Sequence, residues 1–208
     1  MTDRPVTTRT RRPEARPAEI LSAALDLFAE KGFSATRMED VASRAGLSKA
    51  AIYLYFKDKM ALLKALVNEM AGANLAVAKG FAEAHEGPVG PLLQTILTFM
   101  ARQLRDTRFP ELMKVVISES RAHPDVGKLY LDSVVSQGLP IFEGVIRRGI
   151  AAGEFRDIDP ALAVKAMIAP MLLAAIWKTV FEPLGAEALD IEAYVAQHVE
   201  TFLRGIAK

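Results

Sequence analysis

The stretch that decides the fold runs from Thr36 to Lys59 and reads TRMEDVASRAGLSKAAIYLYFKDK. The apolar residues of its first half share one helical face, at Met38, Val41, Ala42 and Ala45. Thr36 followed three residues later by Glu39 predicts a capping box at the start of this helix, and Gly46 predicts its end. Ser48 then caps a second, shorter helix, which we expect to run through Tyr55. A helix, a tight turn and a short helix over residues 37–56 indicate a helix-turn-helix unit.

The second helix of this unit has an apolar face and a face that is free for contact. At about 100° per residue, the apolar face holds Ala51, Ile52, Tyr55 and Phe56, and the free face holds Lys49, Ala50, Tyr53 and Leu54. Such a helix can enter the major groove of DNA with its first residues at the base edges.

The free face predicts particular DNA contacts. We expect Lys49 to reach a guanine edge or a phosphate, and Tyr53 to donate its hydroxyl to a phosphate oxygen. The apolar side chains of Ala50 and Leu54 suit thymine methyl groups. The N–H groups at the helix starts also favour phosphate. Further contacts there are expected from Thr36, Arg37, Ser48 and Lys59.

Composition and charge are those of a globular protein whose positive charge lies near its N-terminus. The chain has 208 residues, of which 51% are hydrophobic and 25% charged, and it contains no cysteine. Disulfides, thiolate metal sites and iron–sulfur clusters are therefore excluded. The net charge is +1, but residues 1–60 carry +3, from 11 Lys and Arg against 8 Asp and Glu, and residues 61–208 carry −2. The positive excess lies where phosphates would be bound.

Helical spacing continues on both sides of the quoted stretch, and strand signals are nearly absent, which predicts an all-α protein. Pro17 opens a first helix that Gly32 ends, and Asp58 caps a fourth helix. After a break at residues 87–91 we expect longer helices at about 92–105, 110–122, 125–152, 160–181 and 188–206.

These elements suggest a flexible basic arm at residues 1–16, a helix-turn-helix domain at 17–62 and a larger helical domain at 63–208, joined through the fourth helix. Pro140 and Pro170 predict a kink or a break within two of the long helices. The N-terminus lacks the apolar segment of a secretory signal. The most apolar run, residues 166–177, is too short for about 20 membrane-spanning residues. We therefore expect a cytoplasmic protein with no membrane partner.

Three segments, Ile20–Phe33, Thr36–Ala42 and Gly46–Lys59, resemble the N-terminal part of the tetracycline-repressor (TetR/AcrR-like) family of transcriptional regulators. They resemble, in turn, its first helix with a glycine stop, its second helix, and its recognition helix with the start of the fourth. The resemblance implies an all-α homodimer that reads an operator and has a larger ligand-binding and dimerisation domain. Ala50 and Ala51 stand where members often have small polar residues, so a hydroxyl contact at position 51 is not carried over.

The larger domain offers candidate residues for a pocket. Its apolar walls would be Phe99, Met100, Met113, Ile117, Phe142 and Met167, and its polar anchors Arg102, Arg105 or Tyr130. The eight methionines of the chain suggest an interior that adapts to an apolar or aromatic molecule.

The last two helices would form the dimer interface if the family arrangement holds. Small and apolar residues suited to it are Ala166, Ala174, Trp177, Val195, Val199 and Phe202. Packing within one chain is the alternative for these residues.

The sequence shows no motif of a metal, cofactor or catalytic site. His85, His123 and His198 are far apart and lack paired-ligand spacing. We therefore expect no enzymatic activity, and predict a homodimer that binds double-stranded operator DNA. It would be a repressor, released by an unknown small apolar or aromatic effector. The alternatives are an activator of the same fold, or a helical ligand carrier or enzyme with a structural N-terminal unit.

Overall fold

The computed structural model describes residues 16–208, so the expected basic arm falls outside the described residues except for Arg16. Within this range the elements are helices, and the one strand-like pairing is an isolated bridge between Phe155 and Ala207. The all-α prediction is confirmed. The α-helices are α1 Arg16–Ala35, α2 Met38–Arg44, α3 Lys49–Ile52, α4 Lys59–Leu66, α5 Ala73–Ala84, α6 Val89–Asp106, α7 Phe109–Glu119, α8 Pro124–Tyr130, α9 Ser136–Ala151, α10 Pro160–Ile176 and α11 Ile191–Ile206.

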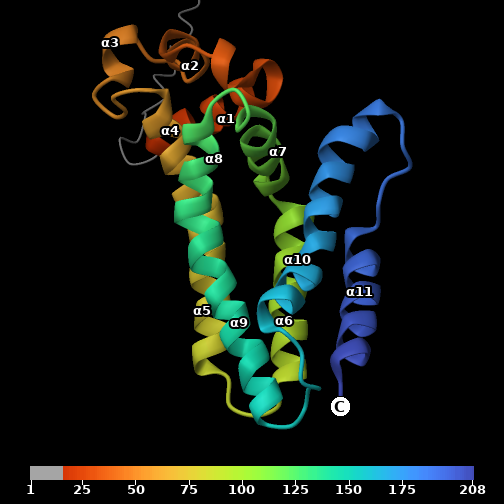
Figure 1. Ribbon diagram of the computed structural model, residues 1–208. Coiled ribbons are helices and arrows are strands. Elements are labelled where there is room, and N and C mark those ends of the chain that lie inside the picture. Colours follow the sequence, from red (N-terminus) through yellow and green to blue (C-terminus); the bar gives the residue numbers. More distant parts are fainter. Residues whose placement is uncertain (1–15) are drawn as a thin grey trace, which may run out of the picture.

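Helices α1–α4 form a small head, and α5–α11 form a longer bundle that extends away from it (Figure 1). The head packs around side chains that include Ile20, Phe28, Val41, Ile52 and Leu62, all 0–2% exposed. Gly32 interrupts α1 with φ +86°, a conformation that favours glycine, and the chain winds on to Ala35 before α2 begins. The prediction that Gly32 ends the first helix is confirmed, because its backbone is non-helical and the helical turn that continues to Ala35 lies beyond this kink.

Short π-helical segments join several helices into longer rods. Val67–Gly72 links α4 to α5, Leu131–Val135 links α8 to α9, and Trp177–Phe181 extends α10 before the 3₁₀ turn Glu182–Leu184. Pro140 lies inside α9 and Pro170 inside α10, so neither proline breaks its helix.

Two of these rods, Lys59–Ala84 and Pro160–Leu184, are long and apolar enough to cross a membrane by length and composition alone. Their packing gives another reason for that composition. The first begins in the head core with Leu62, Leu63 and Leu66, and the second contacts α6, α7, α9 and α11. Core helices of soluble proteins pass the same test.

The head and the bundle share a core at α7 and α8. Leu112, Val115 and Val116 of α7 and Val126 of α8 belong to the same buried cluster as the head residues. A second cluster fills the bundle between α6, α9, α10 and α11. Helix α7 therefore packs on the head along one side and on the bundle along the other.

Candidate nucleic-acid interface and ligand cavity

The helix-turn-helix geometry predicted for residues 37–56 is present in the head. Helix α2 ends before Gly46, whose φ of +66° makes the turn, and Ser48 caps α3 by accepting the Ala51 N–H at 3.2 Å. Regular α-helix ends at Ile52, but the backbone N–H groups of Leu54, Tyr55 and Phe56 still bond back to residues 51 and 52. The recognition segment is therefore one helical turn with a tightly wound extension.

The two faces of this segment are arranged nearly as expected. The free-face residues Lys49, Ala50, Tyr53 and Leu54 are all exposed, and Leu54 is 85% exposed. On the other face Ile52 is fully buried and Phe56 half-buried. Tyr55, expected in the core, is 42% exposed, because the winding tightens after Ile52 and turns its side chain outward. Tyr55 thus joins the surface that could meet DNA.

Lys49 is held toward α2 by an ion pair. Its ammonium lies 2.8 Å from the carboxylate of Glu39. The hydrogen bond between them lowers the pKa of Glu39 and raises that of Lys49. Both side chains are open to water, so the pair is weak and can exchange for a phosphate contact.

The start of α2 differs from the expected capping box. The N-cap residue is Arg37, and its N–H is bound at 3.2 Å by the carboxylate of Asp40, so Thr36 and Glu39 do not form the box. Lys31 also contacts Asp40 at 2.5 Å, and this bond is the main cause of the lowered pKa of that carboxyl. Arg37 itself is exposed at the start of α2.

Thr36 and Lys59, expected at phosphates, have internal partners. Thr36 is 2% exposed, and its hydroxyl donates to the carbonyl of Gly32 at 2.8 Å. Its side chain cannot reach DNA, because it closes the end of α1. The Lys59 ammonium donates to the carbonyls of Phe33 at 2.8 Å and Ser34 at 3.0 Å. Lys59 therefore fastens α4 to the end of α1, and this corrects its expected role as a simple phosphate anchor.

Helix α7 is fastened to α1 at both of its ends. Before its first turn, Arg108 lies 2.7 Å from the carboxylate of Asp26. At its last residue, Glu119 accepts the N–H of Phe33 at 3.1 Å and the hydroxyl of Ser34 at 3.3 Å. We call Arg108 and Glu119 the α7 clamp, since each joins one end of α7 to α1.

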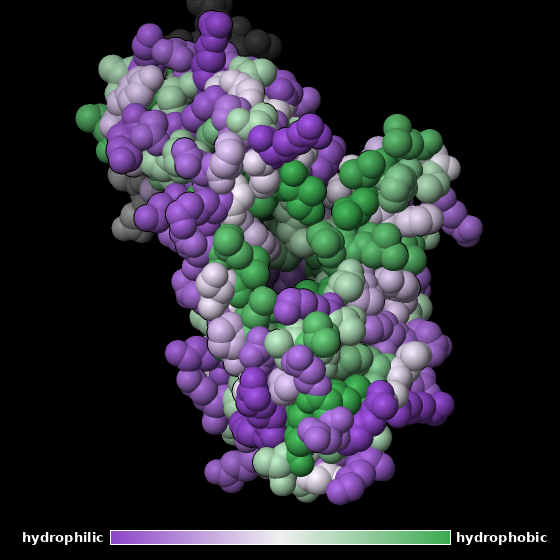
Figure 2. Space-filling view, viewed as in Figure 1, coloured by the Kyte–Doolittle hydropathy of each residue, from purple (hydrophilic) through white to green (hydrophobic). Residues whose placement is uncertain are grey.

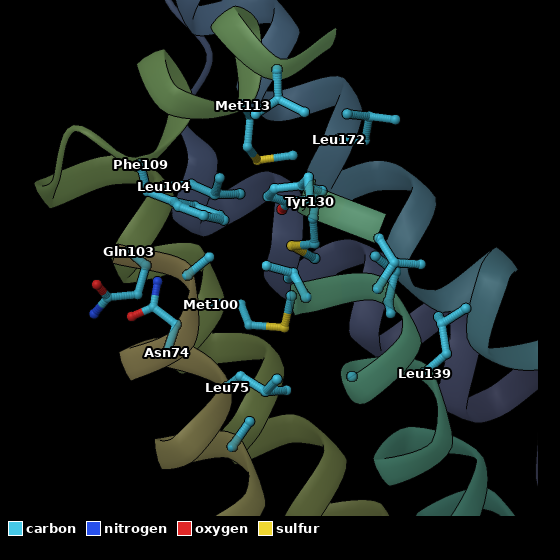
Figure 3. Close-up of a pocket in the computed structure, with 18 of the residues that line it drawn as sticks. Asn74, Leu75, Met100, Gln103, Leu104, Phe109, Met113, Tyr130, Leu139 and Leu172 are labelled. Carbon is cyan, nitrogen blue, oxygen red and sulfur yellow. The ribbon is translucent and has the colours of Figure 1, made fainter. Parts of the chain in front are cut away.

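A cavity of about 380 Å³ lies within the bundle, with walls from α5, α6, α7, α8, α9 and α10 (Figure 3). Of the expected wall residues, Met100, Met113, Ile117 and Phe142 line it, as does the expected anchor Tyr130. Figure 2 shows a hollow bordered by hydrophobic surface between the head and the end of α10. Ile117 and Leu172, both lining residues, are exposed.

The other expected pocket residues lie elsewhere. Phe99 packs against Phe81, with 6.0 Å between ring centroids, and Met167 is fully buried in the bundle core. Arg102 is exposed, and Arg105 pairs with Asp106 at the surface. Residues missed by the sequence include Asn74 and Gln103, which line the cavity from α5 and α6. Helical periodicity marks apolar faces, so it gave no signal for these two amides.

The expected dimer residues divide into two groups. Ala174, Val195 and Val199 are buried inside the single chain, so they cannot also form an interface, which corrects that expectation. Trp177 and Phe202 are half-buried, and Ala166 is exposed. Ala166 belongs to an exposed apolar stripe on α10 at helical spacing, made of Leu162, Ala166, Ala169 and Leu173.

Comparison with known proteins agrees with this geometry. Residues 20–66 match a family model described as bacterial regulatory proteins, tetR family, and residues 93–191 match one described as the tetracyclin repressor-like C-terminal domain. The transcriptional regulator RutR of Escherichia coli is 28% identical over 200 residues, covering 94% of this chain and 91% of its own.

Solved structures show the same fold. The SmeT–triclosan complex superposes with a TM-score of 0.77 at 22% identity, covering 93% of this chain and 92% of that one. FadR from Bacillus subtilis in complex with stearoyl-CoA superposes with a TM-score of 0.74 at 22% identity, covering 91% and 98%. The two family models match most of the head and much of the bundle, and one relative matches nearly end to end. The chain therefore belongs to the tetracycline-repressor family of helix-turn-helix transcriptional regulators.

Proposed function

We propose that this regulator is a homodimeric repressor that leaves its operator when a small apolar molecule enters the cavity. The observation that carries the proposal is the position of α7, which lines the cavity and is clamped to α1. Phe109, Met113, Val116 and Ile117 face the cavity, and all lie between the two clamp residues. A molecule that displaces this wall moves the helix on which the head rests.

Whether the protein binds its operator depends on the distance between the two heads of a dimer. Two recognition segments of a dimer must sit about 34–36 Å apart to enter successive major grooves. An effector that binds better to a dimer with another spacing shifts the population away from the DNA-binding form. The dimer would form through the exposed stripe of α10, which is too apolar to face water without cost. The protein would act in the cytoplasm, as a regulator rather than an enzyme.

DNA binding is tested by fluorescence anisotropy with DNA from upstream of the chain's own gene. We expect a complex that prefers this DNA and weakens steeply with salt. The double variant Lys49→Ala/Tyr53→Ala should lose the preference, whereas Lys79→Ala/Tyr194→Ala, with the same residue types in the bundle, should keep it. Equal binding to unrelated DNA would refute the proposal.

Release is tested with a library of apolar compounds. Compounds that bind the native protein raise its melting temperature, and we expect those that do so to lower operator affinity as well. If every stabilising compound leaves the operator complex intact, the protein is not released by an effector in this cavity. In a strain lacking the gene, neighbouring transcripts should rise; a fall would mean activation.

A further inference from the structure

Glu39 and Lys49 lie on the two helices of the helix-turn-helix unit, α2 and α3, at the end of the head away from the bundle (Figure 1). Glu39 is the second residue of α2, and Lys49 is the first residue of α3. When such a unit docks on DNA, the first residues of the second helix meet base edges, and the first helix crosses the phosphate backbone. The ion pair therefore joins a cation on the base-reading helix to an anion on the helix that crosses the phosphates.

The carboxylate of Glu39 is ionised and bound to Lys49 in the free protein. The hydrogen bond from Lys49 is the main cause of the lowered pKa of Glu39, and the nearby charge of Arg37 lowers that pKa further. The Glu39 side chain is 41% exposed and the Lys49 side chain 70% exposed, so an approaching duplex can reach both. Lys49 thus meets DNA with a negative charge 2.8 Å from its ammonium.

This neighbouring charge changes what Lys49 can bind. An ammonium has three N–H donors, so Lys49 can keep its bond to Glu39 and still donate to the uncharged O6 and N7 atoms of a guanine. A phosphate oxygen in the same position would bring a second anion within about 6 Å of the carboxylate, and like charges at that distance repel. Breaking the ion pair instead would leave Glu39 unpaired beside the backbone. Both phosphate arrangements cost free energy that a guanine contact avoids.

We propose that Glu39 is a positioning residue for operator specificity, which directs Lys49 to a guanine edge and away from phosphate. The inference rests on the operator binding of the proposed function, but is independent of the effector and its cavity. Unrelated DNA offers a phosphate at every nucleotide, whereas it offers a guanine in the right position only by chance. Glu39 therefore lowers affinity for unrelated DNA more than affinity for the operator.

Fluorescence anisotropy of the full-length protein tests this role, with DNA from upstream of its own gene and with an unrelated duplex of equal length. In Glu39→Gln the lysine is free to bind phosphate on any DNA. We expect this variant to bind the unrelated duplex about fivefold to tenfold more tightly at about 0.1 M salt, the contribution of one added phosphate contact. The slope of log affinity against log salt should steepen by about one. Affinity for upstream DNA should change by no more than about twofold, so the preference should fall by at least about 2.5-fold.

Two controls separate this role from a general effect of charge. Glu83 forms a similar exposed pair with Lys79 on α5, 3.6 Å apart, so Glu83→Gln removes the same charge in the bundle and should leave both affinities unchanged. In Lys49→Ala/Glu39→Gln there is no ammonium to release. Its affinity for the unrelated duplex should therefore lie within about twofold of that of Lys49→Ala.

A modified duplex tests the guanine contact itself. Upstream DNA in which 7-deazaguanine replaces guanine lacks the N7 acceptor but keeps every phosphate. We expect wild type to bind this DNA at least about fivefold more weakly than the unmodified DNA, whereas Lys49→Ala should lose less than about twofold.

The inference is overturned by an unchanged salt slope or an unchanged preference in Glu39→Gln. It is also overturned if wild type binds both forms of upstream DNA equally, or if Glu39→Gln strengthens binding to unrelated DNA as much without Lys49 as with it. These outcomes leave effector release standing, because no effector is present. A wild-type protein with no preference for its upstream DNA would refute both proposals.

Discussion

Glu119 accepts the backbone N–H of Phe33 at 3.1 Å, and so joins the last residue of α7 to the end of α1 across 86 positions of sequence. Gly32, with φ +86°, precedes this bond, and a Cβ there would lie 2.7 Å from the Glu119 carboxylate. The contact therefore depends on a kink that only glycine makes without strain.

Removing this carboxylate should loosen the coupling of the cavity to the head. We expect Glu119→Ala to lower the free energy of unfolding by about 2 kcal/mol, because a partly buried N–H loses a charged acceptor. Denaturant unfolding measures this change. A compound that still binds the variant should release less operator DNA than it does from wild type. Glu83→Ala, on the exposed face of α5, is the control. If both variants release operator DNA to the same extent, Glu119 does not couple the cavity to the head.

Lys59 should contribute to the stability of the fold rather than to phosphate binding. Lys59→Met removes hydrogen bonds to two carbonyls and the cation over the Phe33 ring, 4.6 Å from its centroid. We expect unfolding to become easier by about 1–3 kcal/mol, with an unchanged salt dependence of DNA binding. A true phosphate anchor would instead reduce the salt slope by about one. Lys57→Met, at an exposed neighbour, shows how much either quantity changes when a surface lysine is lost.

The fold of this chain was readable from its sequence because helical spacing and capping residues act locally. Ser48, Asp58 and Asp159 each accept an N–H at the start of a helix, as their residue types predict. The wrong assignments concern tertiary choices. Thr36 has the sequence of a helix cap, yet its hydroxyl bonds back to α1, since the Gly32 kink brings those carbonyls within reach.

The candidate sites were harder to foresee, because an apolar residue on a helix can face a core, a cavity or a partner. Met167 and Met113 are alike in sequence, but one is buried in the bundle and the other lines the cavity. Whether a methionine lies in the core or lines the cavity depends on how α6, α7 and α10 are spaced. No local sequence pattern encodes that spacing. The recognition face was easier to predict, because assigning a residue to it requires only the position of that residue on one short helix.

Leu54 should contribute to DNA binding and not to stability. Its side chain is 85% exposed on the recognition segment, so Leu54→Ala should change the free energy of unfolding by less than about 0.5 kcal/mol. Loss of apolar contact with thymine methyl groups should weaken operator binding by about fivefold to tenfold. Leu184→Ala removes a leucine that is 80% exposed in the bundle, and should alter neither quantity. Unchanged operator affinity in Leu54→Ala would show that this residue does not contribute to the DNA interface.

The exposed stripe of α10 should hold two chains together. Leu173 is 46% exposed on it, and Leu173→Glu would bring two carboxylates into an apolar contact, so the variant should elute as a monomer with light-scattering mass to match. Leu131→Glu changes a leucine of similar exposure, 50%, on the segment between α8 and α9, and should remain a dimer. A dimeric Leu173→Glu variant would place the interface on another face.

Stability at high pH should depend on Tyr130. Burial raises the pKa of its phenol to about 12, from an ordinary value of 10.0. Between these values the unfolded chain releases the proton and the folded chain keeps it, so the contribution is complete below pH 10 and declines as pH rises toward 12. We expect wild type to lose about 1–2 kcal/mol more than Tyr130→Phe across this interval, measured by urea unfolding at several pH values. Tyr194→Phe on α11 controls for the loss of a tyrosine elsewhere. Parallel pH profiles for wild type and Tyr130→Phe would mean that the cavity is wet enough to solvate a phenolate.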